Sequence, residues 1–210
     1  MSAETFAPVR ESERERAFDT IVLAFASDPV ERWLYPEAHH YLAAFPALVA
    51  AFGGGAFAHE TVWRVGEFSA VALWFPPGAE ADGDAIVAVL RETVAPTQHE
   101  DIFAVVQQMD DAHPRFAHWY LPWLAADPVL QGQGFGSEVL GRCLRIVDED
   151  HLPAYLETPN PSTIPFYERH GFEVTGEARA GACPPVTLML RPPDSMQVGL
   201  TTFSQPASGY

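Results

Sequence analysis

Residues 121–136, LPWLAADPVLQGQGFG, constrain the fold of this chain more than any other stretch. They read as an apolar strand, a short turn, a glycine-rich loop and the start of a helix. Gly132, Gly134 and Gly136 leave the backbone bare, so successive N–H groups can point into one concavity. Apolar residues recur at helical spacing over 137–147, which places the loop at the positive end of a helix dipole. The sequence therefore predicts a site for a phosphorylated ligand, and in particular a pyrophosphate.

The spacing within the loop narrows the choice of ligand. The Gly-Lys-Ser/Thr ending of a P-loop is missing, and the dinucleotide fingerprint with its early strand does not fit. Gln131, Gly134 and Gly136 instead fill the pattern Gln-x-x-Gly-x-Gly. This pattern resembles the acetyl-CoA loop of the GNAT N-acetyltransferase superfamily, and the resemblance implies acetyl-CoA as the ligand.

A second motif follows at a suitable separation. Residues 153–160, PAYLETPN, read as a strand, and residues 164–172, IPFYERHGF, resemble the superfamily's short helix with its Phe-Tyr-x-x-x-Gly-Phe ending. More closely, AVALW at 70–74, LET at 156–158, PFYER at 165–169 and GF at 171–172 resemble the puromycin N-acetyltransferase branch. The strong resemblance covers about the last half of the chain before the tail, and the N-terminal part matches only loosely.

The resemblance implies an α/β fold, the GNAT acyl-CoA N-acyltransferase fold, in which helices cover both faces of a mixed, mostly antiparallel central sheet with splayed central strands. A chain of 210 residues with 48% hydrophobic content can bury a full core, and its length favours one domain. We expect an acetyltransferase domain over 1–191. Residues 192–210 lack periodicity and bulk, which predicts a mobile C-terminal tail.

Periodicity and turn signals predict the individual elements. Ser12 and Glu15 form a capping-box pattern before the first helix. Pro122 cannot donate a ladder hydrogen bond, so its strand must be interrupted or have an unpaired position there. The resemblance implies a bulge that parts this strand from the next and leaves a slot for the pantetheine arm. We expect strands over 5–9, 62–65, 69–75, 116–126, 153–160, 172–176 and 185–190, and helices over 12–26, 38–52, 84–94, 99–112 and 137–149, with a short helix from 164 and a short aromatic segment over 30–36.

The resemblance also implies which residues bind acetyl-CoA. Loop amides would hold the pyrophosphate, and the end of the preceding strand would pair with the pantetheine amides. Gln133 departs from the family, where Lys or Arg often stands, so phosphate attraction should be weaker. Asn160 would touch CoA or form an Asx turn, and the two uses are compatible. The full set is Leu124, Ala125, Ala126, Gln131, Gly132, Gln133, Gly134, Phe135, Gly136, Ser137, Asn160 and Tyr167.

Two residues are candidates for proton transfer. The resemblance implies that Tyr167 is the general acid for the departing thiolate, the alternative being a ring that only packs the short helix. Glu157 is the candidate general base, because period-2 alternation puts it on one side of its strand with Tyr155. Glu157 could instead orient the amine or bind a backbone N–H. His118 is a weaker alternative base, and an N–H near Ala126 could face the thioester oxygen.

The net charge of −16 argues against nucleic acid and anionic membranes as partners and suits a cationic one, although acidity also serves solubility. We therefore expect an N-acetyltransferase that transfers an acetyl group directly from acetyl-CoA to a small amine, such as an antibiotic or another cationic amine, with a role in antibiotic resistance. The alternatives are a protein or peptide amine as acceptor, and a non-catalytic acyl-CoA-binding protein. Aromatic residues that could line an acceptor pocket, with core packing as the other reading, are Trp33, Tyr35, Trp74, Phe75 and Trp119.

No metal is implied, because the histidines are scattered without ligand spacing. Cys143 and Cys183 show no disulfide or metal pattern, so we expect reduced thiols. The N-terminus lacks a signal-peptide pattern, and no run approaches the roughly 18 apolar residues of a membrane span. These features predict a cytoplasmic protein. The oligomeric state stays open, with a homodimer among the alternatives.

Overall fold

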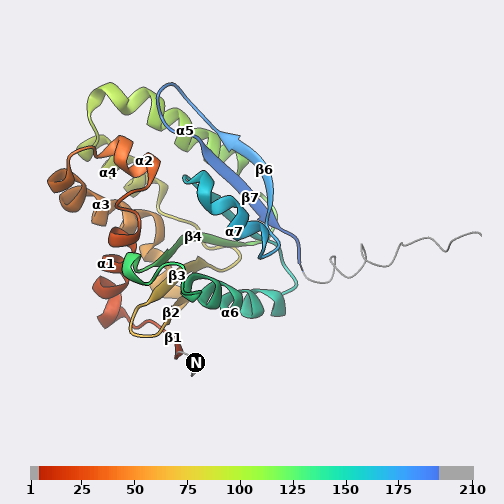
Figure 1. Cartoon of the computed structure of the whole chain (residues 1–210). Coiled ribbons are helices and arrows are strands. Elements are labelled where there is room, and N and C mark those ends of the chain that lie inside the picture. Colours follow the sequence, from red (N-terminus) through yellow and green to blue (C-terminus); the bar gives the residue numbers. More distant parts are fainter. Residues whose placement is uncertain (1–4, 194–210) are drawn as a thin grey trace, which may run out of the picture.

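A computed structural model describes residues 5–193, which fold around a seven-stranded sheet (Figure 1). The spatial order is β1-β2-β3-β4-β5-β7-β6, and among these neighbours only β4 and β5 run parallel. The expected mixed, mostly antiparallel sheet is confirmed. Apart from Pro192 and Pro193, the predicted tail lies outside the described residues. The strands are β1 (Phe6–Pro8), β2 (Val62–Val65), β3 (Ala70–Phe75), β4 (Trp119–Ala126), β5 (Ala154–Thr158), β6 (Glu173–Ala178) and β7 (Val186–Arg191).

Seven α-helices lie within the described residues, and they cover both faces of the sheet. In Figure 1 the red-to-brown helices α1, α2 and α3 gather on one side, while the green α6 lies on the other. Residues of the first five helices pack in one hydrophobic cluster, and α6 and α7 pack in another. The helices are α1 (Arg14–Ala24), α2 (Pro29–Leu34), α3 (Ala38–Gly53), α4 (Gly83–Thr93), α5 (His99–Ala112), α6 (Phe135–Glu149) and α7 (Ile164–Glu168).

Strand β3 shows how the two faces are built. All six of its residues are buried, as expected for a strand covered on both sides. Val71 and Leu73 face the cluster formed with α1 to α5, whereas Ala72 and Trp74 face the cluster formed with α6. This alternation fixes which side of the sheet each helix occupies.

Two segments near the N-terminus differ from what the sequence pattern indicated. The aromatic segment over 30–36 is largely a helix, α2, because the Asp28 carboxylate accepts hydrogen bonds from the N–H groups of Val30 and Glu31 at 2.9 and 3.3 Å. The Ser12–Glu15 capping box does not form. Instead, the Arg10 N–H donates to the Glu13 carboxylate at 3.2 Å, and a short 3₁₀ turn precedes α1.

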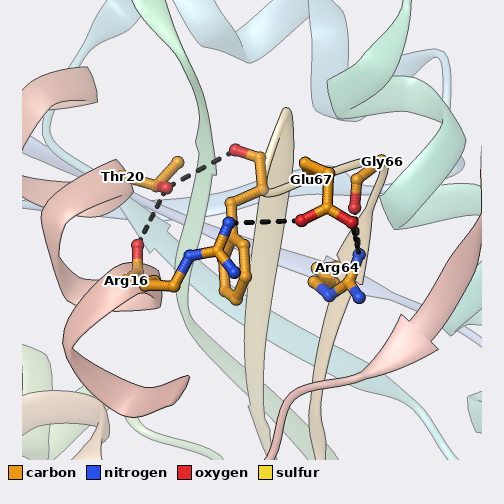
Figure 2. Close-up of polar contacts among 6 residues, drawn as sticks. Arg16, Thr20, Arg64, Gly66 and Glu67 are labelled. Atoms are coloured by element: carbon orange, nitrogen blue, oxygen red, sulfur yellow. Dashed lines mark hydrogen bonds and ion pairs between the residues drawn. The ribbon is translucent and has the colours of Figure 1, made fainter.

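Helix α1 is tied to the turn between β2 and β3 (Figure 2). Arg16 Nη2 lies 3.2 Å from Glu67 Oε2, and the Thr20 hydroxyl donates to the Phe68 carbonyl at 3.5 Å. Arg64 donates to the Gly66 carbonyl in the same turn. Phe68 in this turn adopts a positive φ of 70°, which is uncommon for a residue other than glycine. These contacts fix α1, whose C-terminal end borders the site described below.

Helix α3 continues through a 3₁₀ segment to His59. The resulting stretch, Ala38–His59, is 22 residues long and is apolar enough to cross a membrane by length and composition alone. The expectation that no run approaches such a span was therefore wrong. More than half of its most apolar window is buried inside the protein, as in the core helix of a globular domain, so the stretch is weak evidence for a membrane span.

Candidate functional site

Strands β4 and β5 part after three residue pairs. Trp119 pairs with Ala154, and the last pair is Leu121 with Leu156. The next residue of β4 is Pro122, which has no N–H to continue a ladder. The β3–β4 register also shifts between Leu73 and Phe75, so β4 carries one extra residue there. The irregularity predicted at Pro122, and the splay of the central strands, are confirmed.

Beyond the splay, β4 directs backbone groups into the gap. The Asp127 N–H donates to the Ser69 carbonyl on the β3 side at 3.0 Å. Because amides alternate along a strand, those of Leu124 and Ala126 face the side that β5 has left. The Ala126 carbonyl accepts a bond from Gln131 Nε2 at 3.2 Å. An extended ligand could therefore add to this edge of β4 as a strand would.

The glycine-rich loop has the conformation that the sequence demands. Gly132 and Gly134 have φ values of 77° and 94°, and a Cβ at either position would meet no atom within 4 Å. Gly134 is the N-cap of α6, so the N–H groups of the first helical turn have no partner within the helix. The loop is thus an open, bare cradle at the positive end of α6, and it fits a pyrophosphate.

A cleft of about 590 Å³ joins the loop to the gap between the strands, and we call it the loop cleft. It contains every residue predicted to bind acetyl-CoA except Gln133. The segment between α1 and α2 forms the opposite wall. The lining residues are Ala24, Phe25, Ser27, Asp28, Leu124, Ala125, Ala126, Leu130, Gln131, Gly132, Gly134, Phe135, Gly136, Ser137, Thr158, Asn160, Ser162, Thr163, Phe166, Tyr167 and Arg169.

Three polar side chains, Arg169, Ser137 and Asn160, line the loop cleft near the glycine-rich loop and α7. Arg169 lines the cleft and is exposed, so its guanidinium can reach an anion there. His170 Nε2 lies 3.0 Å from Ser137 Oγ and holds that hydroxyl at the start of α6. Asn160 caps the turn before α7 by accepting bonds from the Ser162 N–H and hydroxyl at 3.0 and 2.8 Å. The predicted Asx turn at Asn160 is therefore present within the cleft.

A smaller cavity of about 90 Å³, the chamber, lies behind the loop cleft. The two cavities share Phe25, Leu124, Thr158 and Tyr167, so the chamber opens into the cleft at Tyr167. Its walls are mostly apolar, with two carboxylates among them. The remaining lining residues are Val30, Glu31, Leu34, Leu48, Phe52, Leu90, Ile102, Val105, Val106, Met109, Tyr120, Leu121, Pro122, Trp123, Glu157, Pro159 and Val186.

Tyr167 lies where the cleft and the chamber meet. Its side chain is 9% exposed, and burial, with a smaller effect of the Asp28 carboxylate, raises the pKa of its hydroxyl above the ordinary value. The hydroxyl therefore stays protonated at neutral pH. Asp28 is itself buried, and burial raises the pKa of its carboxyl from 3.8 to about 6 despite the hydrogen bonds from the α2 amides. The junction thus combines a proton donor with a nearby carboxylate.

A third cavity, the mouth, opens on the far side of the chamber and has a volume of about 600 Å³. It shares Phe52, Val106, Met109, Tyr120 and Glu157 with the chamber, and none of its lining residues with the loop cleft. Glu80, Asp84 and Asp110 join Glu157 along its wall, against Arg91 and Arg115. A ligand entering here would reach Tyr167 from the opposite side to one held by the glycine loop.

Glu157 borders both the chamber and the mouth and lies beside a pair of histidines. Its Oε1 atom is 3.7 Å from His113 Nδ1, and His113 Nε2 is 3.0 Å from His118 Nε2. Burial, followed by the negative charge of Glu157, raises the pKa of the Tyr120 hydroxyl. The same two causes raise the pKa of Tyr155, which is consistent with the predicted common side for Glu157 and Tyr155. Burial lowers the pKa of His118.

The five aromatic residues predicted to line an acceptor pocket lie elsewhere. None of them lines the cleft, the chamber or the mouth formed by residues 5–193. Trp74 and Trp119 pack edge to face under α6, with ring centroids 6.4 Å apart. Phe75 stacks on Tyr120, Trp33 packs at the edge of the α1–α5 cluster, and the Tyr35 hydroxyl lies 2.9 Å from that of Thr93. All five side chains pack within or at the edge of the hydrophobic clusters, which is the other reading that the sequence allowed.

Sequence reasoning missed three charged residues of the site, Asp28, Glu31 and Arg169. Asp28 falls between the helix predicted over 12–26 and the aromatic segment over 30–36, and Glu31 falls within that segment. Arg169 belongs to the motif PFYER at 165–169, two positions after Tyr167. A cationic residue in a motif expected to contact acetyl-CoA was a usable signal for a phosphate contact. Within residues 5–193, no group of three or more His, Cys, Asp or Glu side chains is placed to hold a metal ion.

Known proteins share this architecture and sequence pattern. A sequence model of the "Acetyltransferase (GNAT) family" matches residues 37–172, which include the glycine-rich loop and Tyr167. A Schizosaccharomyces pombe protein described as an "uncharacterized N-acetyltransferase" is 25% identical over 212 residues, covering 89% of this chain and 83% of that protein.

Solved structures share the fold. A Corynebacterium glutamicum protein described as "histone acetyltransferase HPA2 and related acetyltransferase" superposes with a TM-score of 0.63 at 24% identity, covering 91% of this chain and 97% of the other. Arylalkylamine N-acetyltransferase 2 of Aedes aegypti gives a TM-score of 0.62 at 9% identity, covering 90% and 99%. An agmatine N-acetyltransferase mutant gives 0.59 at 15% identity, again covering 90% and 99%.

Proposed function

We propose, from the premise that this chain belongs to the GNAT family and is an acetyl-CoA-dependent acyltransferase, that it acetylates the amine of a small cationic molecule. The observation that carries the proposal is the chamber, which is reached from the loop cleft on one side and from the mouth on the other. Residues of α2, α3, α4 and α5 wall it in. Such enclosure favours a small acceptor over a protein segment, which would need an open groove.

The loop cleft would hold acetyl-CoA in an extended pose. The first-turn amides of α6 and Arg169 would bind the phosphates, and the Leu124 and Ala126 amides would pair with the pantetheine. When bound, acetyl-CoA supplies a thioester whose carbon forms the new C–N bond as the C–S bond breaks. The Ala126 N–H is the donor that could stabilise the thioester oxygen as it gains charge.

Two side chains would move the protons of this transfer. Glu157 accepts the proton that the acceptor nitrogen loses, and Tyr167 donates its hydroxyl proton to the departing sulfur. The raised pKa of Tyr167 supports the second role, because the hydroxyl must be protonated to donate. His113, 3.7 Å from Glu157, is the next acceptor on the way to the mouth.

Asp28 is a second carboxylate near the reacting centre, and its pKa of about 6 suits a base at neutral pH. We assign the base to Glu157 because it lines the chamber, whereas Asp28 lines only the cleft and accepts hydrogen bonds from two α2 amides. Glu157→Gln should abolish general-base catalysis, so turnover should be lost even at saturating amine. If Asp28→Asn did so instead and Glu157→Gln did not, the roles would be reversed.

The acceptor should be sought first among cationic small molecules. The resemblance of 70–74, 156–158 and 165–172 to the puromycin N-acetyltransferase branch supports including aminonucleosides, and the acidic mouth supports other cationic amines. A resistance role would then appear as protection of cells from the acetylated antibiotic. The cytoplasm, where acetyl-CoA is available, is the compartment we propose.

Thiol release from acetyl-CoA over a panel of amines, including puromycin, tests the proposal. At least one amine should raise release well above hydrolysis, and Tyr167→Phe should lower that rate by about 10²- to 10⁴-fold while calorimetry still detects CoA binding. No amine-dependent release, together with label from acetyl-CoA entering proteins of a lysate, would indicate a protein acceptor. CoA binding without transfer to either would indicate a binding protein.

A further inference from the structure

Glu31 is a buried acid, and one of its two side-chain oxygens has no hydrogen-bond partner in the described part of the chain. Its side chain belongs to α2, is 5% exposed and lines the chamber. Its Oε2 atom has almost no accessible surface and makes no hydrogen bond within residues 5–193. A buried carboxylate oxygen left in this state costs free energy that the protein could save with an apolar residue. Such a group therefore points to a ligand that completes it.

The position of Glu31 within the chamber is distinct from those of the reacting groups. Tyr167 marks the opening to the loop cleft, and Glu157 marks the opening to the mouth. Glu31 lines neither of those cavities. It lies in the wall formed with residues of α2 to α5, such as Leu34, Leu48 and Ile102. Glu31 thus lines the chamber only, whereas Tyr167 and Glu157 each line a neighbouring cavity as well.

The charges around Glu31 do not compensate for its own. No ion pair joins it to a cationic side chain in the described part of the chain, and the charge that acts on its pKa is the like charge of Asp28. The other titratable groups that interact with it, Tyr35, Tyr41 and Cys183, carry no positive charge. Burial and Asp28 raise the pKa of Glu31 well above its ordinary value. A cation placed beside it would reverse that effect.

We propose that Glu31 binds a second cationic group of the acceptor, so that the preferred acceptor is a linear diamine with one amine at the transfer point and the other at Glu31. This inference rests on the proposed function and specifies its substrate class. The apolar walls suit the methylene chain between the two amines, and the acidic mouth draws a dication inward. A monoamine of the same size would leave Glu31 unpaired.

The test compares diaminobutane with pentylamine, which have the same number of heavy atoms, using purified full-length protein. In the wild type, kcat/KM should be about 10- to 100-fold higher for the diamine, as expected for one charged hydrogen-bonded pair. Glu31→Gln keeps the shape but removes the charge, and should bring the ratio to about one mainly by lowering the diamine value. Glu37→Gln, an exposed change six positions along, should leave the ratio as it is.

A length series provides a second measurement. Glu31→Asp withdraws the carboxylate by one methylene, so the best diaminoalkane should become one carbon longer. A wild-type ratio at or below one, or a ratio that survives Glu31→Gln, would overturn the proposal. A preference for aminobutanol over diaminobutane that Glu31→Gln abolishes would also overturn it, because the second group would then be neutral.

The two levels of the hypothesis fail differently. If no mono- or diamine is acetylated while CoA still binds, the proposed function fails. If amines are acetylated without discrimination, only the role of Glu31 fails. Thermal melting of each variant shows whether it folds, and if Glu31→Gln does not fold, the wild-type ratio and the Glu31→Asp length series decide the question.

Discussion

Nδ1 of His113 lies 3.7 Å from Oε1 of Glu157, and the far nitrogen of the same ring lies 3.0 Å from His118. These contacts connect a carboxylate of the chamber to the wall of the mouth. In the proposed mechanism, a proton taken up by Glu157 would have a short path over these ring nitrogens towards solvent.

We predict that His113→Gln slows turnover through this path. Glutamine keeps hydrogen-bonding groups but cannot carry the proton, so kcat should fall by about tenfold or more while KM for acetyl-CoA stays the same. Added imidazole should restore part of the rate. His39→Gln, an exposed change, is the control, and equal kcat values for the two variants would show that the histidine pair has no part in turnover.

Asp28→Asn should stabilise the protein at neutral pH. Burial raises the pKa of Asp28 from 3.8 to about 6, so its contribution to stability is full below pH 3.8 and is lost as the pH rises through 6. Asparagine can still accept the hydrogen bonds from the α2 N–H groups, and it has no charge whose burial costs free energy. The gain in free energy of unfolding should grow between pH 4 and 7 to about 3 kcal/mol, measured by urea denaturation.

The control for this prediction is another helix cap. Asp82 accepts a bond from the Ala85 N–H at 2.9 Å at the start of α4, but it is exposed. Asp82→Asn should therefore give no comparable gain. A gain for Asp28→Asn that is the same at pH 4 and pH 7 would contradict a titrating Asp28.

Arg169→Gln should weaken CoA binding. Arg169 is the cationic side chain that lines the loop cleft, where Gln133 does not contribute a charge. Because the contact is exposed, the expected loss is modest, about 3- to 10-fold in Kd at low salt, and it should shrink as salt is added. Calorimetry over a salt series measures it. Arg145→Gln removes a charge from an exposed position of α6 outside the cleft and should leave the Kd unchanged.

Gly134→Ala should impair CoA binding through the backbone. With φ at 94°, alanine is strained by about 1–2 kcal/mol even though no atom would meet its Cβ, so the loop should shift and move its amides. Gly141→Ala on the same helix has no positive φ and equally open space. It should instead raise the free energy of unfolding by about 0.5–1 kcal/mol. Identical CoA affinities in both variants would refute the role of the cradle.

The phosphate side of the site was predictable because its requirements are local. Gly132, Gly134 and the start of α6 are neighbours in sequence, and their backbone conformations alone create the cradle. Tyr167 and Asn160 came from a motif that resembles a known family, and both line the cleft. The family, the fold and the dependence on acetyl-CoA followed from these few positions.

The chamber and the mouth, where we propose that the acceptor binds, were not predictable because they depend on long-range packing. Trp119 and Trp123 have the same parity in β4, yet they lie in opposite hydrophobic clusters, because the extra residue near Pro122 reverses the alternation. No periodicity argument carried through such a bulge can place an aromatic side chain correctly. Glu31 became part of the chamber only because α2 folds back against α3 to α5, which local sequence does not encode.

The loop cleft and the mouth have no lining residue in common. Acetyl-CoA and the amine would therefore enter through separate openings. Acetyl-CoA and the amine could then be bound at the same time, and CoA would not have to leave before the amine binds. Initial-rate data should consequently follow a ternary-complex scheme, in which double-reciprocal plots at several amine concentrations intersect rather than run parallel.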